Sequence, residues 1–140
     1  MNFIPSSVID VGAADGTDVL YQFYPNVRHY AFEPNNEFIP RLKMKTQNLD
    51  CQIFQCGLMD KPGLASFYRH PDPYGSTFMC KGETPQAEQF QVKTLDLALG
   101  EAPLGSNVLL KTDCQGADLF VARGGRITLE HSVNTIKPSL

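Results

Sequence analysis

The chain of 140 residues has the composition of one folded domain, because 42% of its residues are hydrophobic and 19% are charged. Its net charge of −3 and its scattered basic residues exclude an electrostatic footprint for nucleic acid or for an anionic membrane, so we expect neither partner. We expect a cytoplasmic protein with no metal site, because no signal peptide, long apolar run or C-x-x-C pair is visible.

The first part of the chain predicts strands that alternate with helices. The turn that follows the first strand spans residues 12–16, and Thr17 or Asp18 can cap the next helix. A second helix begins at Asn35, and Pro40 is tolerated in its first turn. The predicted strands are residues 8–11, 29–32 and 52–56, and the first helix spans residues 18–23.

The later part of the chain is less regular until a second buried strand appears. Residues 57–88 are rich in Gly, Pro, Asp and Ser, which is typical of loops and short strands. The apolar run at residues 108–113 predicts a buried strand. Further expected elements are strands at 64–68, 90–95 and 132–136, an exposed loop at 70–75, and a helix at 117–122 that ends at 124–125.

Alternating strands and helices predict an α/β fold in which one mostly parallel sheet is built by right-handed crossovers. Such sheets bind ligands beyond the carboxyl ends of their strands. Polar residues follow several predicted strands there, namely those at 10–17, Glu33, Asp60 and Asp113. We therefore expect one domain over residues 1–140 with a ligand site at this edge.

The turn at residues 12–16 and Glu33 together suggest a site for a nucleoside. Gly12 and Gly16 allow a tight turn and the close approach of a ligand to the backbone. Glu33 lies 23 residues after Asp10, at the end of the next strand. In a βαβ unit this interval places a carboxylate beside the turn, where it can accept both ribose hydroxyls.

Both NAD and S-adenosylmethionine (SAM) fit these two features. A dinucleotide site would favour G-x-G-x-x-G, but the middle glycine is absent from Gly12-Ala13-Ala14-Asp15-Gly16. A negative charge on Asp15 is unfavourable beside a pyrophosphate and tolerable beside the ammonium and sulfonium groups of SAM. The charges therefore favour SAM, and an NAD-dependent oxidoreductase stays open as an alternative.

Five stretches together resemble the FkbM-type SAM-dependent methyltransferases. They read IDVGAADGT at 9–17, AFEPN at 31–35, GLMDKPG at 57–63, TLD at 94–96 and LKTDCQGADL at 110–119. The resemblance covers residues 8–125. It implies a class I Rossmann-like methyltransferase fold and methyl transfer from SAM, usually to a hydroxyl oxygen, with S-adenosylhomocysteine (SAH) as the product.

The resemblance also assigns roles along this sequence. It places Asp10, Gly12 and Gly16 around the methionine part of SAM, Glu33 on the ribose, and Asp113 and Gln115 beside the reacting methyl group. Residues 56–58, with Gly57 and Leu58, would flank the adenine. The remaining cofactor-binding candidates are Ala13, Asp15, Thr17 and Pro34.

An acceptor hydroxyl needs a base as its proton leaves. Lys111 and Asp113 are two residues apart on a strand and share a face, so we take both as catalytic candidates with Asp113 as the base. A salt-bridged strand end is the structural alternative for the pair. His70 is a second candidate base, and His131 is a weaker one. Aromatic residues that could line an acceptor pocket, or only pack, are Phe67, Tyr68, Tyr74 and Phe78.

The chain is short for this fold, because it stops soon after Gly125 while the family pattern continues into final strands. It is a minimal member, a fragment, or a protein whose site another chain completes, and a homodimer through an exposed sheet edge would be one such arrangement. The leading hypothesis is an O-methyltransferase acting on a hydroxyl of a small molecule or a sugar. A SAM- or nucleoside-binding module without catalysis is the alternative.

Overall fold

Within the part of the chain that the structure describes, the main sheet has five strands in the order β3-β2-β1-β7-β8, and every neighbouring pair is parallel. A computed structural model describes residues 3–79, 87–130 and 132–136. The strands are β1 (Ser7–Val11), β2 (Arg28–Phe32), β3 (Cys51–Phe54), β7 (Val108–Thr112) and β8 (Ser132–Ile136). The α/β architecture with a parallel, Rossmann-like sheet is therefore confirmed.

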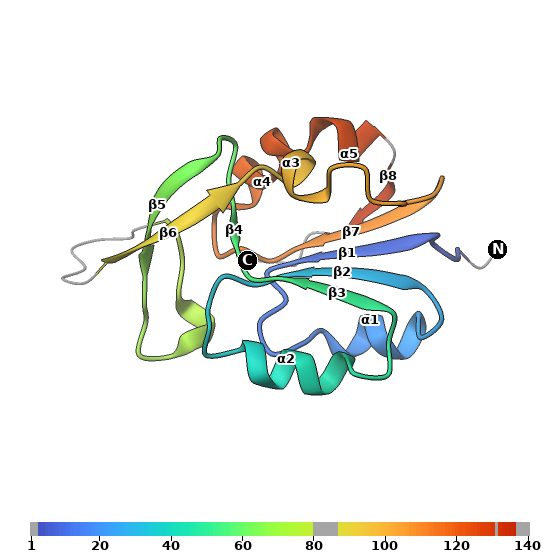
Figure 1. Cartoon of the computed structure of the whole chain (residues 1–140), viewed down its shortest axis with the longest axis horizontal. Helices are drawn as coiled ribbons and strands as arrows, with labels where there is room; N and C mark the ends of the chain where they lie inside the picture. The colour runs from blue at the N-terminus through green and yellow to red at the C-terminus, as the bar shows by residue number, and fades with distance from the viewer. Residues whose placement is uncertain (1–2, 80–86, 131, 137–140) are drawn as a thin grey trace.

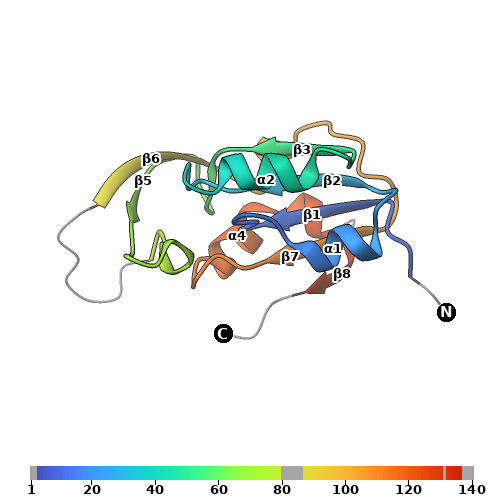
Figure 2. The same ribbon diagram turned by 90° about the horizontal axis from the view of Figure 1, so that it is seen from below.

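Helices cover both faces of this sheet (Figures 1 and 2). One face carries α1 (Asp18–Phe23) and α2 (Ile39–Thr46), and the other carries α3 (Leu95–Leu99), α4 (Asp118–Gly124) and α5 (Arg126–Glu130). The side chains of β1 alternate between the two layers. Val8 packs with Leu20 of α1, whereas Ile9 packs in the cluster that holds Leu95 and Val121. Burial on both faces explains why the strand reads as a continuous apolar run.

A second sheet lies beyond the carboxyl ends of the main strands (Figures 1 and 2). It contains β4 (Gly57–Leu58), β5 (Gly63–Tyr68) and β6 (Ala87–Lys93) in the order β4-β6-β5, with β5 antiparallel to β6. Phe67 and Phe90 stack edge to face across it, with 5.0 Å between ring centroids. A short 3-10 helix, η1 (Pro73–Gly75), follows β5.

The chain crosses to the other side of β1 after the third strand of the main sheet, so β1 and β7 flank the point where the strand order reverses. Ligands of open α/β sheets bind in the crevice outside the carboxyl ends at such a point. The fold therefore places the loops after β1, β2 and β7 around one site. Within the residues described, no helix is both long and apolar enough to cross a membrane.

Several element boundaries differ from the sequence predictions. Asn35 does not cap α2, because its side chain closes a turn on the N–H of Glu37 (3.1 Å) and the helix begins four residues later. The strand expected at 90–95 ends at Lys93, because the hydroxyl of Thr94 caps α3 by accepting from the N–H of Leu97. Thr17 is the N-cap residue of α1 without a side-chain hydrogen bond. The helices α3 and α5 were not predicted.

Candidate active site

One pocket lies at the point of strand reversal, between the main sheet and the second sheet. It encloses about 810 Å³ of empty space, and this volume includes the open solvent at its mouth. From the main sheet it is lined by Val11, Gly12, Ala14, Phe32, Glu33, Pro34, Asn35, Phe38, Asp113, Cys114, Gln115 and Ala117. The other wall is formed by Cys56, Gly57, Leu58, Phe67, Pro73, Tyr74, Ser76, Thr77 and Phe78.

The loop after β1 is held tightly between its two neighbouring strands. Gly12 has a φ of +75°, and a Cβ at this position would lie 2.1 Å from the carbonyl oxygen of Asp113. The N–H groups of Gly12 and Ala13 both donate to the carbonyl of Phe32 at 3.0 Å. Glycine is therefore required at position 12 by both the backbone conformation and the lack of space.

Glu33 lines the pocket with a carboxylate that the backbone holds in place. Its Oε2 accepts from the N–H of Ala14 at 2.8 Å, and its Oε1 accepts from the N–H of Asn35 at 2.8 Å. Burial raises the pKa of this carboxyl, and the two backbone hydrogen bonds oppose that shift. Each oxygen keeps lone pairs for further donors. The carboxylate is thus oriented before any ligand arrives.

Asp10 and Lys111 form a buried ion pair beneath the loop. They are register partners on β1 and β7, and Lys111 Nζ lies 2.8 Å from Asp10 Oδ1. The same ammonium donates to the carbonyl of Gly12 at 3.0 Å and lies 3.5 Å from Thr17 Oγ1. Asp10, Lys111 and Thr17 are not among the lining residues. This arrangement matches the alternative in which Lys111 belongs to a salt bridge at the strand end. Lys111 then has a structural role, because it supports the loop after β1.

Other residues of the loop also lie outside the pocket. Asp15 is buried against α2, where its Oδ2 lies 3.8 Å from Arg41 Nη1 and 3.8 Å from Lys45 Nζ. Ala13 packs in the core on the same side, and a Cβ on Gly16 would contact Lys45. The charge of Asp15, from which SAM was favoured over a dinucleotide, is therefore balanced by α2 and does not line the pocket.

Asp113 and Gln115 line the pocket from the loop after β7. Asp113 follows the last residue of that strand, and its exposed side chain is in the pocket wall. Gln115 adopts a φ of +50°, and its carbonyl accepts from Thr77 Oγ1 at 3.0 Å. Between them, burial raises the pKa of the Cys114 thiol, which keeps that thiol protonated.

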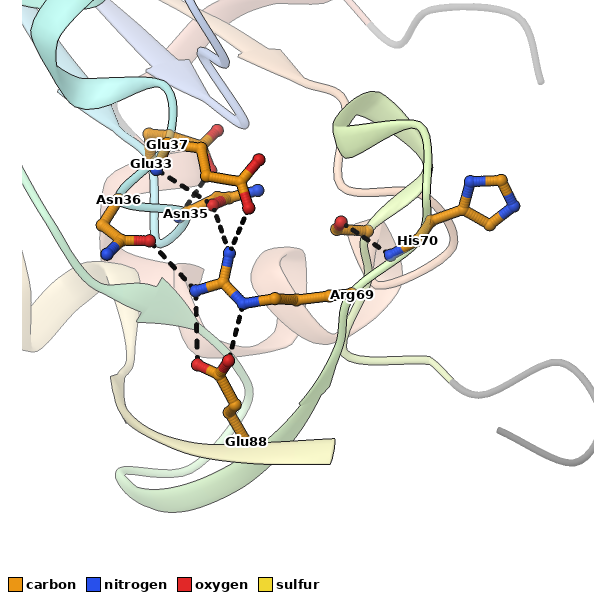
Figure 3. Close-up of polar contacts among 8 residues, drawn as sticks. Glu33, Asn35, Asn36, Glu37, Arg69, His70 and Glu88 are labelled. Atoms are coloured by element: carbon orange, nitrogen blue, oxygen red, sulfur yellow. Dashed lines mark hydrogen bonds and ion pairs between the residues drawn. The ribbon is translucent and has the colours of Figure 1, made fainter. Parts of the chain in front are cut away.

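The other candidates from the sequence divide between the pocket and the surface. Phe67, Tyr74 and Phe78 line the pocket, whereas Tyr68 and His70 do not. The His70 ring is exposed, and its Nδ1 accepts from the N–H of Asp72 at 3.0 Å. Figure 3 shows this ring pointing away from Glu33 and Asn35. His131 lies outside the described residues.

The sequence does not indicate some residues of the pocket wall. Pro73, Ser76 and Thr77 come from a loop whose Pro-rich composition predicts only exposure. Phe38 was assigned to a helix, yet its ring contacts Tyr74 with 4.9 Å between centroids and lines the pocket. No periodicity of the sequence identifies Pro73, Ser76 and Thr77, because they reach the site through the antiparallel pairing of β5 with β6, whereas Phe38 lines the pocket from the N-cap position of α2.

The lining is mostly apolar, with uncharged polar side chains and two carboxylates. Glu33 and Asp113 are its acidic members, and no Lys, Arg or His side chain belongs to the lining that the structure describes. The lining also stops at Ala14 and does not reach the first turn of α1. In a dinucleotide site the pyrophosphate lies on the N-terminus of the helix after β1, and the described lining does not reach that helix and holds no cation, although the N-cap residues of α2 (Phe38) and α4 (Ala117) do line the pocket.

Comparison with known proteins agrees with this geometry. A family model described as the methyltransferase FkbM domain matches residues 10–138. No curated protein and no solved structure matches the chain. The matched segment includes every main-sheet loop that lines the pocket and nearly the whole length of the sequence. The chain therefore belongs to the FkbM methyltransferase family.

Proposed function

We propose that the protein transfers a methyl group from SAM to a hydroxyl of a small molecule or a sugar. The observation that supports this proposal best is the carboxylate of Glu33, which lines the pocket beside the turn after β1 with both oxygens already oriented by backbone N–H groups. An acid in this position is suited to accept the two hydroxyls of a ribose.

The lining residues fit the parts of SAM. Glu33 would hold the ribose, and the segment 56–58 would flank the adenine with apolar surface. Gly12, Ala14 and the loop 113–115 would surround the methionine part, because Gly12 brings the turn after β1 into close contact with Asp113 and all of these residues line the pocket. When bound, SAM would supply an electrophilic methyl group.

Asp113 is the group of this chain that we propose as the base. Its carboxylate is in the pocket wall, where it could accept the proton of an acceptor hydroxyl. The aromatic wall of Phe67, Tyr74 and Phe78 would hold the acceptor and exclude water from it. Alignment of the two reactants contributes a large part of such catalysis, and a rigid wall supplies it.

The structure also bears on the alternatives. A dinucleotide would find no cation in the described lining and would not reach the first turn of α1, where a pyrophosphate is usually held, which disfavours an NAD-dependent oxidoreductase. A binding module without catalysis would need only the cofactor half of the pocket. Here the second sheet and η1 supply a further wall from the same chain, which supports an enzyme with its own acceptor side.

The proposal is tested by transfer of a labelled methyl group from SAM to a panel of sugars and small alcohols. We expect transfer by the wild type, and we expect Asp113→Asn to bind SAH normally while turnover falls about 10²–10⁴-fold. Asp18→Asn is the matched control, because Asp18 is an exposed carboxylate on α1 outside the pocket. Full turnover by Asp113→Asn would contradict the assignment of the base, and SAH binding without transfer to any hydroxyl would favour the binding module.

A further inference from the structure

The segment at residues 69–79, which we call the arm, contacts all the loops that form the pocket. It leaves β5, and a bridge between Tyr68 and Thr77 closes it (N–H to O, 2.8 and 3.0 Å). Thr77 Oγ1 donates to the carbonyl of Gln115 in the loop after β7. The ring of Phe78 packs against Gly57, where a Cβ would lie 2.4 Å from it.

The arm also reaches the loops after β1 and β2. The nearby carboxylate of Asp15, in the loop after β1, raises the pKa of the Tyr74 hydroxyl. Arg69 contacts the turn formed by residues 35–37 (Figure 3). Four loops that are distant in sequence are therefore each joined to the arm. A ligand in the pocket would lie between the arm and these loops.

Arg69 is the most extensively bonded side chain of the arm. Its Nε and Nη2 donate to the two carboxylate oxygens of Glu88 on β6, at 2.7 and 3.2 Å. Its Nη1 donates to Asn35 Oδ1 and to Glu37 Oε1, both at 2.9 Å, and its Nη2 donates to Asn36 Oδ1 at 3.0 Å. The planar fork of a guanidinium can bond to all these groups at once, whereas a lysine ammonium cannot.

These contacts lead to the cofactor side of the pocket through Asn35. The side chain of Asn35 is held by Arg69, and its backbone N–H donates to Glu33 Oε1 at 2.8 Å. Two donors, from Arg69 and from the N–H of Glu37, meet Asn35 Oδ1, so the amide orientation is determined by this network. Arg69 thus fixes the turn that orients Glu33, although Arg69 itself does not line the pocket.

We propose that the arm closes over the pocket and that its closed position and the binding of SAM or SAH favour each other. Arg69 is the positioning residue that couples the two. This inference rests on the proposed function, because it assigns SAM to the pocket. The contacts made by Arg69 are partly exposed to solvent, with 27% of its side chain accessible, so water can hydrogen-bond to the same groups when the arm opens to admit a ligand. Linkage requires that a ligand which stabilises the closed arm binds more tightly when the arm is already closed.

The test combines calorimetric titration of SAH with amide hydrogen exchange of the whole chain, for the wild type and for Arg69→Lys. We expect SAH to slow exchange in the arm and in the turn 35–37 of the wild type. In Arg69→Lys, exchange of these two segments should rise before ligand is added, exchange of β1 and β7 should stay unchanged, and the Kd for SAH should rise about 3–10-fold.

Arg28→Lys is the matched control. Arg28 also pairs with a carboxylate, that of Asp50, and lies over an aromatic ring, that of Tyr30, but it is at the start of β2 and outside the pocket. We expect this variant to bind SAH with the wild-type Kd and to keep the arm protected. Glu88→Gln should have an effect intermediate between the wild type and Arg69→Lys, because one acceptor of the bidentate pair remains.

The outcomes separate this inference from the proposed function. If the wild type binds SAH, and Arg69→Lys binds it equally well with equal protection of the arm, the coupling is overturned while the proposed function stands. If exchange in β1 and β7 rises together with that of the arm, Arg69 has only a general structural role and the coupling is overturned as well. If the wild type does not bind SAH, the proposed function fails and the coupling fails with it.

Discussion

The carboxylate of Glu33 and the backbone N–H of Ala14 are joined by a hydrogen bond of 2.8 Å between the loops that follow β2 and β1. Through this contact, the carboxylate of Glu33 belongs to the same rigid unit as the glycine turn. Hydrogen bonds to a charged group contribute about 1.5–3 kcal/mol each, so the carboxylate is held firmly and its free lone pairs face a fixed direction. Orientation before binding lowers the cost of ordering the site around a ligand.

Glu33→Gln should weaken SAH binding about 10–100-fold. Replacement of the carboxylate by an amide leaves one acceptor oxygen for the donors at Ala14, Asn35 and the ribose, and a charged hydrogen bond of about 1.5–3 kcal/mol is lost. Titration calorimetry measures the change. Glu101→Gln, at an exposed position outside the pocket, is the control and should bind like the wild type. Unchanged affinity in Glu33→Gln would show that the acid does not contact the ligand.

The affinity for SAH should fall as the pH falls through the pKa of Glu33, which burial raises above its ordinary value of 4.5. Ionised Glu33 accepts the ribose hydroxyls, whereas the protonated form has less capacity to accept. The contribution of Glu33 to the free energy of unfolding should change in the opposite direction, and rise as the pH falls. A carboxyl with a raised pKa favours the folded state at low pH, and this contribution is lost as the pH rises from the unfolded value through the folded one.

The two effects can be measured separately by titration of SAH and by denaturant unfolding over the same pH range. In Glu33→Gln, the pH dependence that Glu33 causes should be absent from both the affinity for SAH and the free energy of unfolding. A pH profile for SAH binding that is the same in the variant and in the wild type would contradict the assignment.

Lys111→Met should destabilise the fold by about 3–5 kcal/mol, because it leaves the buried carboxylate of Asp10 without its partner. Adding Asp10→Asn should recover part of the loss, with a coupling of roughly 0.5–3 kcal/mol in a double-mutant cycle. Urea unfolding of the four proteins gives these values. Simply additive losses would mean that the ion pair at 2.8 Å does not stabilise the loop.

Gly12→Ala should cost about 3 kcal/mol or more of unfolding free energy. A positive φ strains a non-glycine residue by about 1–3 kcal/mol, and the new methyl group would overlap the carbonyl of Asp113. Gly63→Ala is the matched control, because Gly63 also has a positive φ but a methyl group added there would meet no atom within 4 Å. Equal losses in the two variants would show that the close approach to Asp113 has no energetic effect.

The cofactor side of the site could be predicted because its signals are local in sequence. A buried run, a glycine turn and an acid at the end of the next strand belong to one βαβ unit, whose geometry fixes their proximity. Glu33, Asp113 and Gln115 were all placed at the edge where the pocket lies. The side chains of Asp10 and Lys111 were placed on the right strands, but strand position alone does not say that they pair beneath the loop.

The direction of the Asp15 side chain and the position of the arm could not be predicted, although Tyr74 and Phe78 of the arm were possible pocket residues. Asp15 turns to α2 because Arg41 and Lys45 are there, and only the packed fold brings these residues together. The arm carries no hydrophobic periodicity. Its position depends on the pairing of β5 with β6 and on contacts of Arg69 with residues more than thirty positions away. Such contacts leave no pattern in a single sequence.

The proposal that the pocket at the carboxyl ends of β1 and β7 binds SAM is tested by titration of the purified wild-type protein with SAH and, in parallel, with NAD. We expect saturable one-to-one binding of SAH, with no measurable heat from NAD at the same concentrations. Binding of NAD without SAH, or binding of neither, would contradict it.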